Sequence, residues 1–473
     1  MATTVFERQA PPASAVEHSL AQSRRGGFWL NDLGPRVQHP RLTADIHADL
    51  VVVGGGYCGL WTALLAKQRD PDRSVVLLEA KTVGWAASGR NGGFVAASLT
   101  HGAANGEARF PQELAQLDRL GMENLDAIER TVAELGLDCD FERSGGIDIA
   151  TEPHQVEWLR EAAAADPHSQ LLEGDAIRAL VDSPTYLAGL RDARTTALVH
   201  PAKLAVELAR VAVEAGVQIF EDTRVTELDS DGDGVQVRTP DARVQAGSVA
   251  LATNVYPSLL ARNRLMTVPV YDYVLMTEPL TDAQLAAIGW SGREGIGDAA
   301  NQFHYYRLSA DNRILWGGYD AVYYAGGKVR SRYEKRPKSF ERLASHFLTT
   351  FPQLEGIRFT HRWAGAIDTC SRFCAFYGTA RKGRVAYAAG FTGLGVGATR
   401  FAAEVMLDLL SGEKTERTEL EMVKSLPIPF PPEPLASIGI QATRWSLDRA
   451  DHREGRRNVL LKAMDAVGLG FDS

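Results

Sequence analysis

A glycine-rich turn with the pattern G-x-G-x-x-G, at positions 54–59, constrains the fold of this chain more than any other sequence feature. The preceding run Leu50–Val53 is short and continuously apolar, which is typical of a parallel strand buried on both faces. Leu60–Arg69 follows with its leucines on one helical stripe, and Ser74–Leu78 is a second apolar run. The order of these elements predicts a β-α-β unit and a parallel sheet near the start of the chain.

Each glycine of this turn has its own physical role. Gly54 allows a tight turn, Gly56 lets a pyrophosphate approach bare backbone, and Gly59 lets the helix pack close to the strand. The helix N-terminus offers N–H groups and a positive dipole end to the phosphates. Glu79, twenty residues after Gly59, can accept hydrogen bonds from ribose hydroxyls. Its charge would repel a 2′-phosphate, so the pattern predicts NAD or FAD rather than NADP.

Composition excludes several classes of function. The chain has 473 residues, of which 45% are apolar, and 51 basic against 59 acidic residues give a formal net charge of −8. This balance provides no basic excess for nucleic acid, and no apolar run approaches the roughly 20 residues that cross a bilayer. The first thirty residues lack the apolar core of a secretory signal. Four cysteines are too few for a disulfide scaffold, so we predict a reducing, cytoplasmic setting.

Later segments indicate that the nucleotide-binding domain is discontinuous. Pro201–Glu214 has helical periodicity and is followed by short apolar strands. Near the end, the strand Val385–Ala388, a glycine-rich turn and a helix expected over 398–410 make a last α/β unit. This second turn would again direct helix N–H groups toward a ligand.

The segments between these units have a different character. Gln112–Leu135 and Val156–Leu190 are expected to be mostly helical, whereas Val268–Thr277 and Phe303–Trp316 alternate as strands do. We therefore predict an N-terminal loose arm (1–44), a nucleotide-binding domain (45–105, 195–265 and 360–415), an inserted substrate-binding domain (106–194 and 266–359) and a C-terminal extension (416–473). A helix is expected over Ile438–Ser473, with a solvated or subunit-contact face that carries Arg444, Arg449, Arg453, Arg456 and Arg457.

The loop after Glu79 distinguishes between the two dinucleotides. Residues 80–93 are small, polar and rich in glycine, which is unusual beside a nucleotide site unless backbone must touch a flat ligand. This loop contains the sequence SGRNGG at positions 88–93. Together with the fingerprint, it resembles the D-amino-acid-oxidase-like (DAO) family of FAD oxidoreductases, and most closely the γ-glutamylputrescine oxidase branch. The motifs that carry the resemblance extend from about residue 45 to residue 412.

The resemblance implies an α/β fold, in which a Rossmann-like three-layer FAD domain holds an inserted substrate domain with a mixed β-sheet. It also implies oxidation of the C–N bond of a primary or secondary amine or amino acid, by hydride transfer to flavin N5, to give an imine that hydrolyses. FAD is expected to be noncovalent, because Ser88 lies near the position where some relatives attach flavin through His. The residues expected to hold FAD are Gly54, Gly56, Tyr57, Cys58, Gly59, Glu79, Ala80, Lys81, Ala87, Ser88, Arg90, Asn91, Gly92, Gly93, Val225, Thr253, Asn254, Gly390, Gly393, Leu394 and Gly395.

The substrate side gives a weaker signal. Arg307 is the candidate for holding a substrate anion, because a guanidinium pairs with a carboxylate in a two-pronged way; an ordinary ion pair is an equal alternative. Tyr273, Tyr306 and Trp316 are candidates for lining the pocket, although aromatic residues on strands more often belong to the core. Sarcosine oxidases of the resembling family have a strand lysine that promotes reaction with oxygen, and 313–318 contains none.

Three questions stay open at this level. The electron acceptor is O2 or another compound, and the oligomeric state is not determined by the sequence. No metal site is predicted. The alternative functions are an NAD-linked dehydrogenase with the same fingerprint, and a non-catalytic nucleotide-binding protein.

Overall fold

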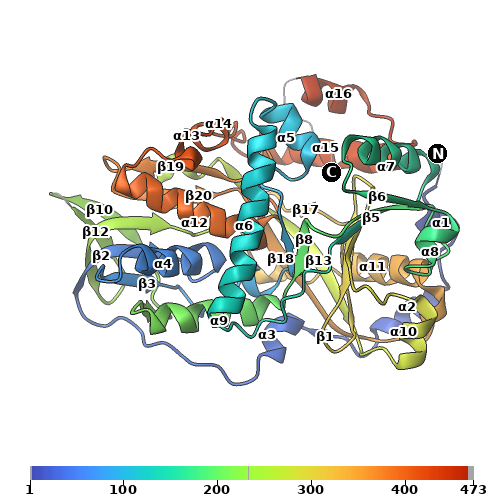
Figure 1. Cartoon of the computed structure of the whole chain (residues 1–473), viewed down its shortest axis with the longest axis horizontal. Coiled ribbons are helices and arrows are strands. Elements are labelled where there is room, and N and C mark those ends of the chain that lie inside the picture. The colour runs from blue at the N-terminus through green and yellow to red at the C-terminus, as the bar shows by residue number, and fades with distance from the viewer. Residues whose placement is uncertain (1–2, 233, 467–473) are drawn as a thin grey trace.

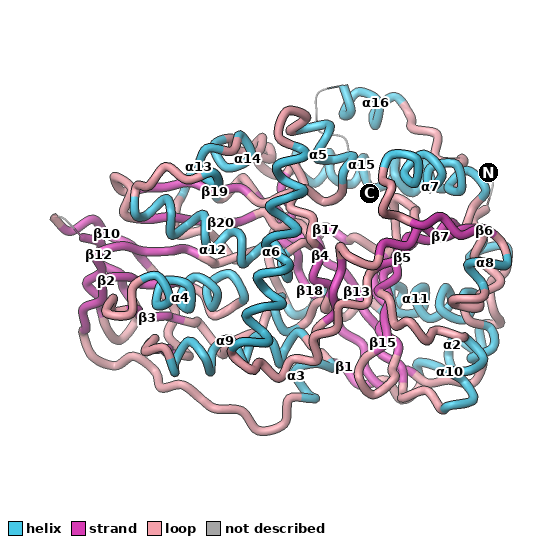
Figure 2. The backbone as a smooth tube through the Cα atoms, viewed as in Figure 1, coloured by secondary structure: helices cyan, strands magenta, loops and turns pink. Residues whose placement is uncertain are grey.

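The protein is described by a computed structural model, which covers residues 3–232 and 234–466. Its strands gather mainly in two large sheets, and the long helix α6 (Leu114–Glu134) crosses the front of the molecule between them (Figure 1 and Figure 2). In this described part of the chain, no helix combines the length and apolar character that a membrane crossing needs.

The first sheet contains the predicted β-α-β unit. Its parallel strands are β2 (Ile46–Val53), β3 (Val75–Leu78), β9 (Gln218–Phe220), β12 (Arg243–Leu251) and β20 (Val385–Ala389). Antiparallel strands β10 (Glu227–Asp231), β11 (Gly234–Arg238) and β19 (Phe376–Ala380) complete it. The helices α4 (Tyr57–Arg69), α9 (Pro201–Glu214) and α12 (Gly395–Ser411) share a core with one face of the sheet. A second core lies on the opposite face, as expected for strands buried on both sides.

The second sheet is mixed and belongs mostly to the predicted inserted region. Its strand order is β1-β18-β13-β16-β15-β14-β5-β7-β6, with β17 paired to β13. The bounds are β1 (Arg24–Arg25), β5 (Gly146–Ala150), β6 (Gln170–Glu173), β7 (Ala188–Asp192), β13 (Thr267–Thr277), β14 (Gly295–Asp298), β15 (His304–Leu308), β16 (Ile314–Gly318), β17 (Val322–Tyr323) and β18 (Phe359–Cys370). Helix α11 (Pro337–Thr350) packs on one face. The other face contributes to the cavity described below.

The expectation of a mostly helical segment over Val156–Leu190 is only partly correct. Helix α7 (Pro153–Ala165) and the short α8 (Asp175–Arg178) are present, but β6 and β7 lie in the same stretch. A small antiparallel pair, β4 (Phe94–Ala96) with β8 (Thr196–Leu198), lies outside both large sheets. The short strands contain too few residues to show a clear period of two, so their pairing depends on partners far along the chain.

The N-terminal segment is not the loose arm that its polar composition predicts. It forms α1 (Val5–Arg8), α2 (Ala13–Leu20) and α3 (Phe28–Asp32), and β1 joins the second sheet. Val16 and Leu20 pack into the core under α11, and Phe28 and Trp29 pack against the second sheet and Ala202 of α9. These apolar residues form only short groups in the sequence, and each group occupies a hollow formed by later segments. Local periodicity therefore could not reveal them.

The C-terminal extension contains two helices where one was expected. Helix α15 (Leu435–Asp451) ends before a turn in which Gly455 has φ = +74°, and α16 (Val459–Ala466) follows. The last seven residues of the predicted helix, 467–473, lie outside the described residues. The extension contacts the rest of the protein through polar bonds: Asp451 accepts hydrogen bonds from the backbone N–H groups of Asn301 and Gln302, and Gln441 donates to the Tyr323 carbonyl.

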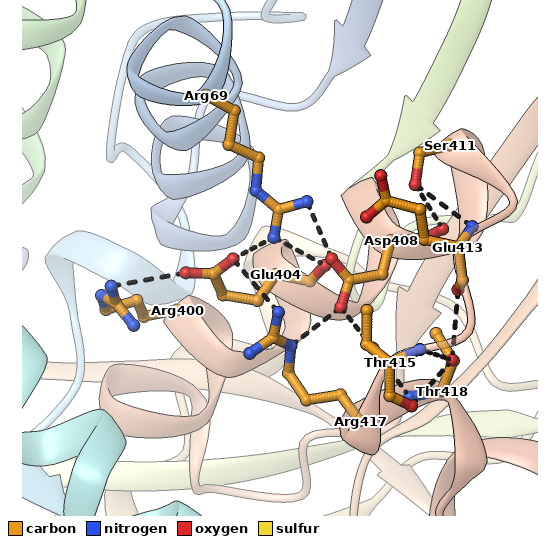
Figure 3. A network of polar contacts seen from close by, with 9 residues as sticks. All are labelled: Arg69, Arg400, Glu404, Asp408, Ser411, Glu413, Thr415, Arg417 and Thr418. Carbon is orange, nitrogen blue, oxygen red and sulfur yellow. Dashed lines mark hydrogen bonds and ion pairs between the residues drawn. The ribbon is translucent and has the colours of Figure 1, made fainter.

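A buried ion-pair network joins the C-terminal ends of α4 and α12 (Figure 3). Asp408 of α12 is 1% exposed and pairs with Arg69, the last residue of α4, at 2.8 Å and with Arg417 at 2.9 Å. Thr415 also donates to Asp408 at 2.8 Å, and Glu404 pairs with Arg69. The network fixes the two helices to each other at the ends opposite the glycine-rich turns.

Candidate active site

A cavity of about 1300 Å³ is lined by residues of both large sheets. Most of the residues predicted to hold a cofactor line it: Gly54, Gly56, Tyr57, Cys58, Glu79, Ala80, Ala87, Ser88, Arg90, Asn91, Gly92, Gly93, Val225, Thr253, Asn254, Gly393, Leu394 and Gly395. Gly59, Lys81 and Gly390 are not among the lining residues. Segments separated by more than three hundred residues in sequence thus face one space.

The glycine turn before α4 has the close contacts that its pattern predicts. A Cβ on Gly54 would lie 2.4 Å from the Ala252 carbonyl oxygen, and Gly54 has φ = +118°. A Cβ on Gly59 would lie 1.9 Å from the Gly54 carbonyl oxygen, so Gly59 serves helix packing and does not reach the cavity. The helix N-cap, Gly56, makes no side-chain capping bond. The first turn of α4 therefore directs its N–H groups toward the cavity.

Glu79 lies at the carboxyl end of β3, beside this turn. Its Oε2 accepts a hydrogen bond from Gly55 N–H at 2.7 Å, and its Oε1 accepts from Lys81 N–H and from Trp85 Nε1–H, both at 2.8 Å. Burial raises the pKa of Glu79, although these donors oppose the shift. The Lys81 side chain is 4.0 Å from the centroid of the Trp85 ring. Lys81 thus orients Glu79 through its backbone, and its side chain does not line the cavity.

The SGRNGG loop is held at several points by side chains from elsewhere in the chain. Trp363 Nε1–H donates to the Arg90 carbonyl at 2.8 Å, and Trp29 Nε1–H donates to the Asn91 carbonyl at 2.9 Å. Within the loop, Asn91 Oδ1 accepts from Gly93 N–H at 2.8 Å. Ser88 Oγ accepts from Tyr57 N–H at 3.0 Å and so joins the loop to the start of α4. These bonds fix the loop backbone at the cavity wall.

The turn before α12 also lines the cavity, through Gly393 and Leu394. Gly393 has φ = +96°, and the N-cap of α12, Leu394, makes no side-chain capping bond. Asp368, at the end of β18, accepts from Gly390 N–H at 2.7 Å and from Phe391 N–H at 3.3 Å. Burial raises the pKa of Asp368 to about 7. Gly390 is glycine for packing, because a Cβ there would lie within 2.9 Å of Phe376 and Cys370.

The two helix N-termini provide a direct test of whether a flavin dinucleotide fits. The N-cap residues of α4 and α12, Gly56 and Leu394, supply no side-chain cap, and among the described residues only the Tyr57 N–H of α4 is taken by a side chain, Ser88; each helix start therefore presents its other N–H groups and a positive dipole end to the cavity. A pyrophosphate needs one such end, and the negatively charged edge of a reduced flavin ring favours another. Arg90–Gly93 and Gly393–Gly395 line the same cavity, as a flat ring in contact with both would require. The residues present fit the cofactor.

The four residues predicted to line the substrate pocket do not line this cavity. Tyr306 Oη bonds to Tyr186 Oη at 2.7 Å and the Tyr306 ring stacks on Trp316, while Tyr273 Oη donates to the Tyr333 carbonyl at 2.6 Å. All three predicted aromatic residues belong to the core under α11. Successive side chains of a strand point to opposite faces, so the choice was wrong by one residue on these strands.

Arg307 is also not a substrate-binding residue in this structure. Its side chain is buried, and Nη1 donates to the Val199 carbonyl at 2.7 Å and weakly to the Gly93 carbonyl at 3.4 Å. Nε donates to the Leu308 carbonyl at 3.0 Å. Burial lowers the pKa of Arg307 to about 10. The guanidinium supports the SGRNGG loop from behind, so the prediction that it holds a substrate anion is wrong.

Several polar side chains of the second sheet line the cavity, and sequence reasoning missed three of them, Tyr305, Asp272 and Asp148. Tyr305 and Asp272 are the neighbours of the residues that were chosen, and the Tyr305 hydroxyl donates to Asp272 Oδ2. Asp148 of β5 is the third. Burial raises the pKa of Asp272 and of Asp148 to about 6 each. The signal that could have identified them is the strand alternation, once it was known which face α11 covers.

Fold and site together define a flavin-dependent oxidoreductase with a discontinuous nucleotide-binding domain. The profile of the DAO family, described as "FAD dependent oxidoreductase", matches residues 49–409, and the chain belongs to this family. Gamma-glutamylputrescine oxidoreductase of Escherichia coli K12 is 33% identical over 82% of this chain and 89% of its own length. The probable oxidoreductase OrdL of Haemophilus influenzae is 29% identical over 84% and 90%.

Solved structures show the same fold. Glycine oxidase from Geobacillus kaustophilus has a TM-score of 0.66 at 18% identity, covering 80% of this chain and 99% of that structure. L-Proline dehydrogenase from P. horikoshii has a TM-score of 0.65 at 18% identity, covering 81% and 96%. The predicted fold class and family are therefore confirmed.

Proposed function

We propose that the protein oxidises the C–N bond of a primary or secondary amine or an amino acid, using noncovalently bound FAD. The observation that carries this proposal is the cavity in which the N-termini of α4 and α12 and the SGRNGG loop face the sheet that bears Asp148, Tyr305 and Asp272. The named relatives and structural neighbours that act on amines or amino acids support it. Family membership argues against the NAD-linked alternative.

In this reaction the substrate loses a hydride from the carbon beside nitrogen and a proton from nitrogen, and the resulting imine is hydrolysed to a carbonyl compound and either ammonia, from a primary amine, or an amine, from a secondary one. FAD, when bound, accepts the hydride and so supplies the redox chemistry. The protein must then align the C–H bond and exclude water. The glycine turns and the fixed SGRNGG loop position the cofactor, and the second sheet positions the substrate. The reacting nitrogen has to be neutral, so no strong base is required.

Noncovalent attachment is part of the proposal. Cys370 lines the cavity, but its thiol donates to the Cys374 carbonyl at 3.1 Å, and burial raises its pKa. Ser88 already accepts the Tyr57 N–H. Acid precipitation should therefore release yellow flavin into the supernatant. Flavin that stays with the pellet would contradict this part.

The electron acceptor is the second point to be settled. No lysine lines the cavity in the described ranges, which leaves either O2 or another acceptor as the oxidant of the reduced flavin. A hydrogen peroxide assay in air, beside an assay with an artificial acceptor, separates oxidase from dehydrogenase.

A cytoplasmic setting stays a prediction. The four cysteines are buried and form no disulfide among the described residues, which agrees with it.

The decisive experiment is anaerobic mixing of the purified yellow enzyme with a panel of amines, amino acids and N-methylated compounds. Loss of flavin absorbance with one class of compound is the expected result. A colourless preparation that binds NAD would favour the nicotinamide alternative. A flavin that stays oxidised with every compound would favour the non-catalytic nucleotide-binding alternative.

A further inference from the structure

The face of the second sheet that lines the cavity is acidic. The strand register places Asp148 opposite Gly297, Gly297 opposite Tyr305, and Tyr305 opposite Gly317 in one row across the sheet. Neighbouring strands are about 4.8 Å apart, so Tyr305 lies about 10 Å from Asp148 along this row. We call Asp148, Tyr305 and Asp272 the acidic floor.

Glycines hold the Tyr305 ring in a fixed position on this floor. A Cβ on Gly317 would lie 2.5 Å from Tyr305 Cζ, and a Cβ on Gly92 would lie 2.7 Å from Tyr305 Cε2. The ring therefore lies between the sheet and the SGRNGG loop, with its hydroxyl bonded to Asp272. This arrangement connects the acidic floor directly to a predicted cofactor segment.

Asp148 differs from Asp272 in having no partner. Asp272 accepts the Tyr305 hydroxyl and backbone N–H groups. Asp148 is exposed to the cavity, and no hydrogen bond or ion pair to it is found in residues 3–232 and 234–466. Burial within the protein is the only cause of its raised pKa. The Asp148 carboxylate is open to the cavity and no described protein group pairs with it, so a cationic group of a ligand can pair with it without displacing a protein partner.

The arginines of the cavity wall do not neutralise this floor. Arg90 pairs with Glu334 at 3.1 Å, and Arg444 pairs with Asp320 at 3.4 Å. No described arginine, lysine or histidine forms an ion pair with Asp148 or Asp272. The C-terminal extension also lines the cavity, and apart from Thr443 and Arg444 its lining residues are mostly apolar, including Phe430, Ile440 and Leu447. The cavity thus offers negative charge at the sheet and alkyl-binding surface at the extension.

We propose that Asp148 binds a positively charged nitrogen of the substrate, so that the preferred substrates are amines that carry a second ammonium group besides the nitrogen that is oxidised. This inference rests on the proposed function. An alkylammonium group resembles the Lys side chain, which titrates near pH 10.4, and therefore stays charged at neutral pH. Asp272 and Tyr305 extend the negative surface along the floor. A substrate carboxylate would be repelled from the same surface.

The test compares ligands of equal length: 1,4-diaminobutane, butylamine and 4-aminobutyrate. Flavin-loaded enzyme is first reduced with dithionite, so that no hydride transfer follows, and dissociation constants are measured by calorimetry. We expect the diamine to bind at least tenfold more tightly than butylamine, and 4-aminobutyrate to bind most weakly. Asp148→Asn should weaken the diamine at least tenfold and butylamine less than twofold, whereas Asp148→Glu should restore most of the diamine affinity.

The control is Asp175→Asn, which removes the same charge from a side chain that is 100% exposed on α8. It should leave all three dissociation constants unchanged. Equal affinity of the wild-type enzyme for diamine and butylamine, or equal weakening of both by Asp148→Asn, would overturn the cation site. Anaerobic reduction of the oxidised enzyme by the same amines is measured separately. If no amine reduces the flavin but Asp148→Asn still weakens the diamine selectively, the proposed function fails and the cation site stands.

Discussion

Replacing Arg307 tests the structural assignment most directly, because sequence and tertiary structure assign this residue opposite roles. If Arg307 held a substrate anion, its loss would weaken anionic substrates and leave the fold intact. In the structure, its guanidinium is buried behind the SGRNGG loop and donates to three carbonyls. We therefore expect Arg307→Met, which keeps most of the side-chain volume, to destabilise the fold and to loosen flavin binding.

The magnitude follows from the individual bonds. Gly93 O keeps the hydrogen bond from Val199 N–H at 2.9 Å, so the loss of the long 3.4 Å contact costs little. The Val199 carbonyl loses the shortest bond, at 2.7 Å, to a charged donor. A hydrogen bond to a charged group contributes about 1.5–3 kcal/mol, so the bonds to the Val199 and Leu308 carbonyls together contribute about 3–6 kcal/mol, and part of this is offset because a buried charge is removed. We expect a net loss of about 2–3 kcal/mol in the free energy of unfolding.

The assay is thermal unfolding followed by intrinsic fluorescence and by release of flavin fluorescence. At about 2 °C per kcal/mol, the lower end of the range for large domains, the unfolding midpoint should fall by about 4–6 °C. The control Arg178→Met removes an arginine whose side chain is 37% exposed and should shift the midpoint by less than about 1 °C. An unchanged midpoint, together with a selective loss of affinity for anionic substrates, would refute the reasoning and restore the sequence-based role.

Three further outcomes are expected. Glu79→Ala should lower the ratio of flavin to protein absorbance while circular dichroism stays native, because it removes the carboxylate that orients the turn and that we predict to bind the ribose; an unchanged ratio would exclude a cofactor contact. Asp408→Asn should lower the unfolding midpoint more than Arg307→Met does. It removes a buried carboxylate that pairs with two arginines, and breaking such pairs costs about 3–5 kcal/mol. A shift no larger than that of the Arg178→Met control would show that the network contributes little. The KM for 1,4-diaminobutane, relative to that for butylamine, should rise as the pH falls below about 6, because burial raises the pKa of Asp148 to about 6 and protonation removes its charge; a KM ratio independent of pH between 5 and 8 would contradict this.

Most of the segments predicted to hold the cofactor line the cavity, and they could be identified because their signals are local. A pyrophosphate needs glycine at fixed spacing, at the junction of one strand and one helix, and Gly54, Gly56 and Gly59 are near neighbours in sequence. The same holds for the SGRNGG loop and for Gly393–Gly395. The sequence alone therefore predicted the β-α-β unit, the family and the type of cofactor. In each of these segments, backbone groups that lie within about ten residues of one another in sequence provide the surface that the cofactor needs.

The substrate side depended on information that no single segment contains. Tyr305 and Tyr306 are equivalent in type and differ only in which face of β15 they occupy, and the packing of α11 decides that face. Likewise, Trp29 becomes part of the site only because its indole reaches the Asn91 carbonyl. Only the tertiary structure could decide these roles, because strand pairing and helix packing bring together residues from distant parts of the chain. For the same reason, the proposed role of Asp148 depends on its place in a row of residues built from four strands.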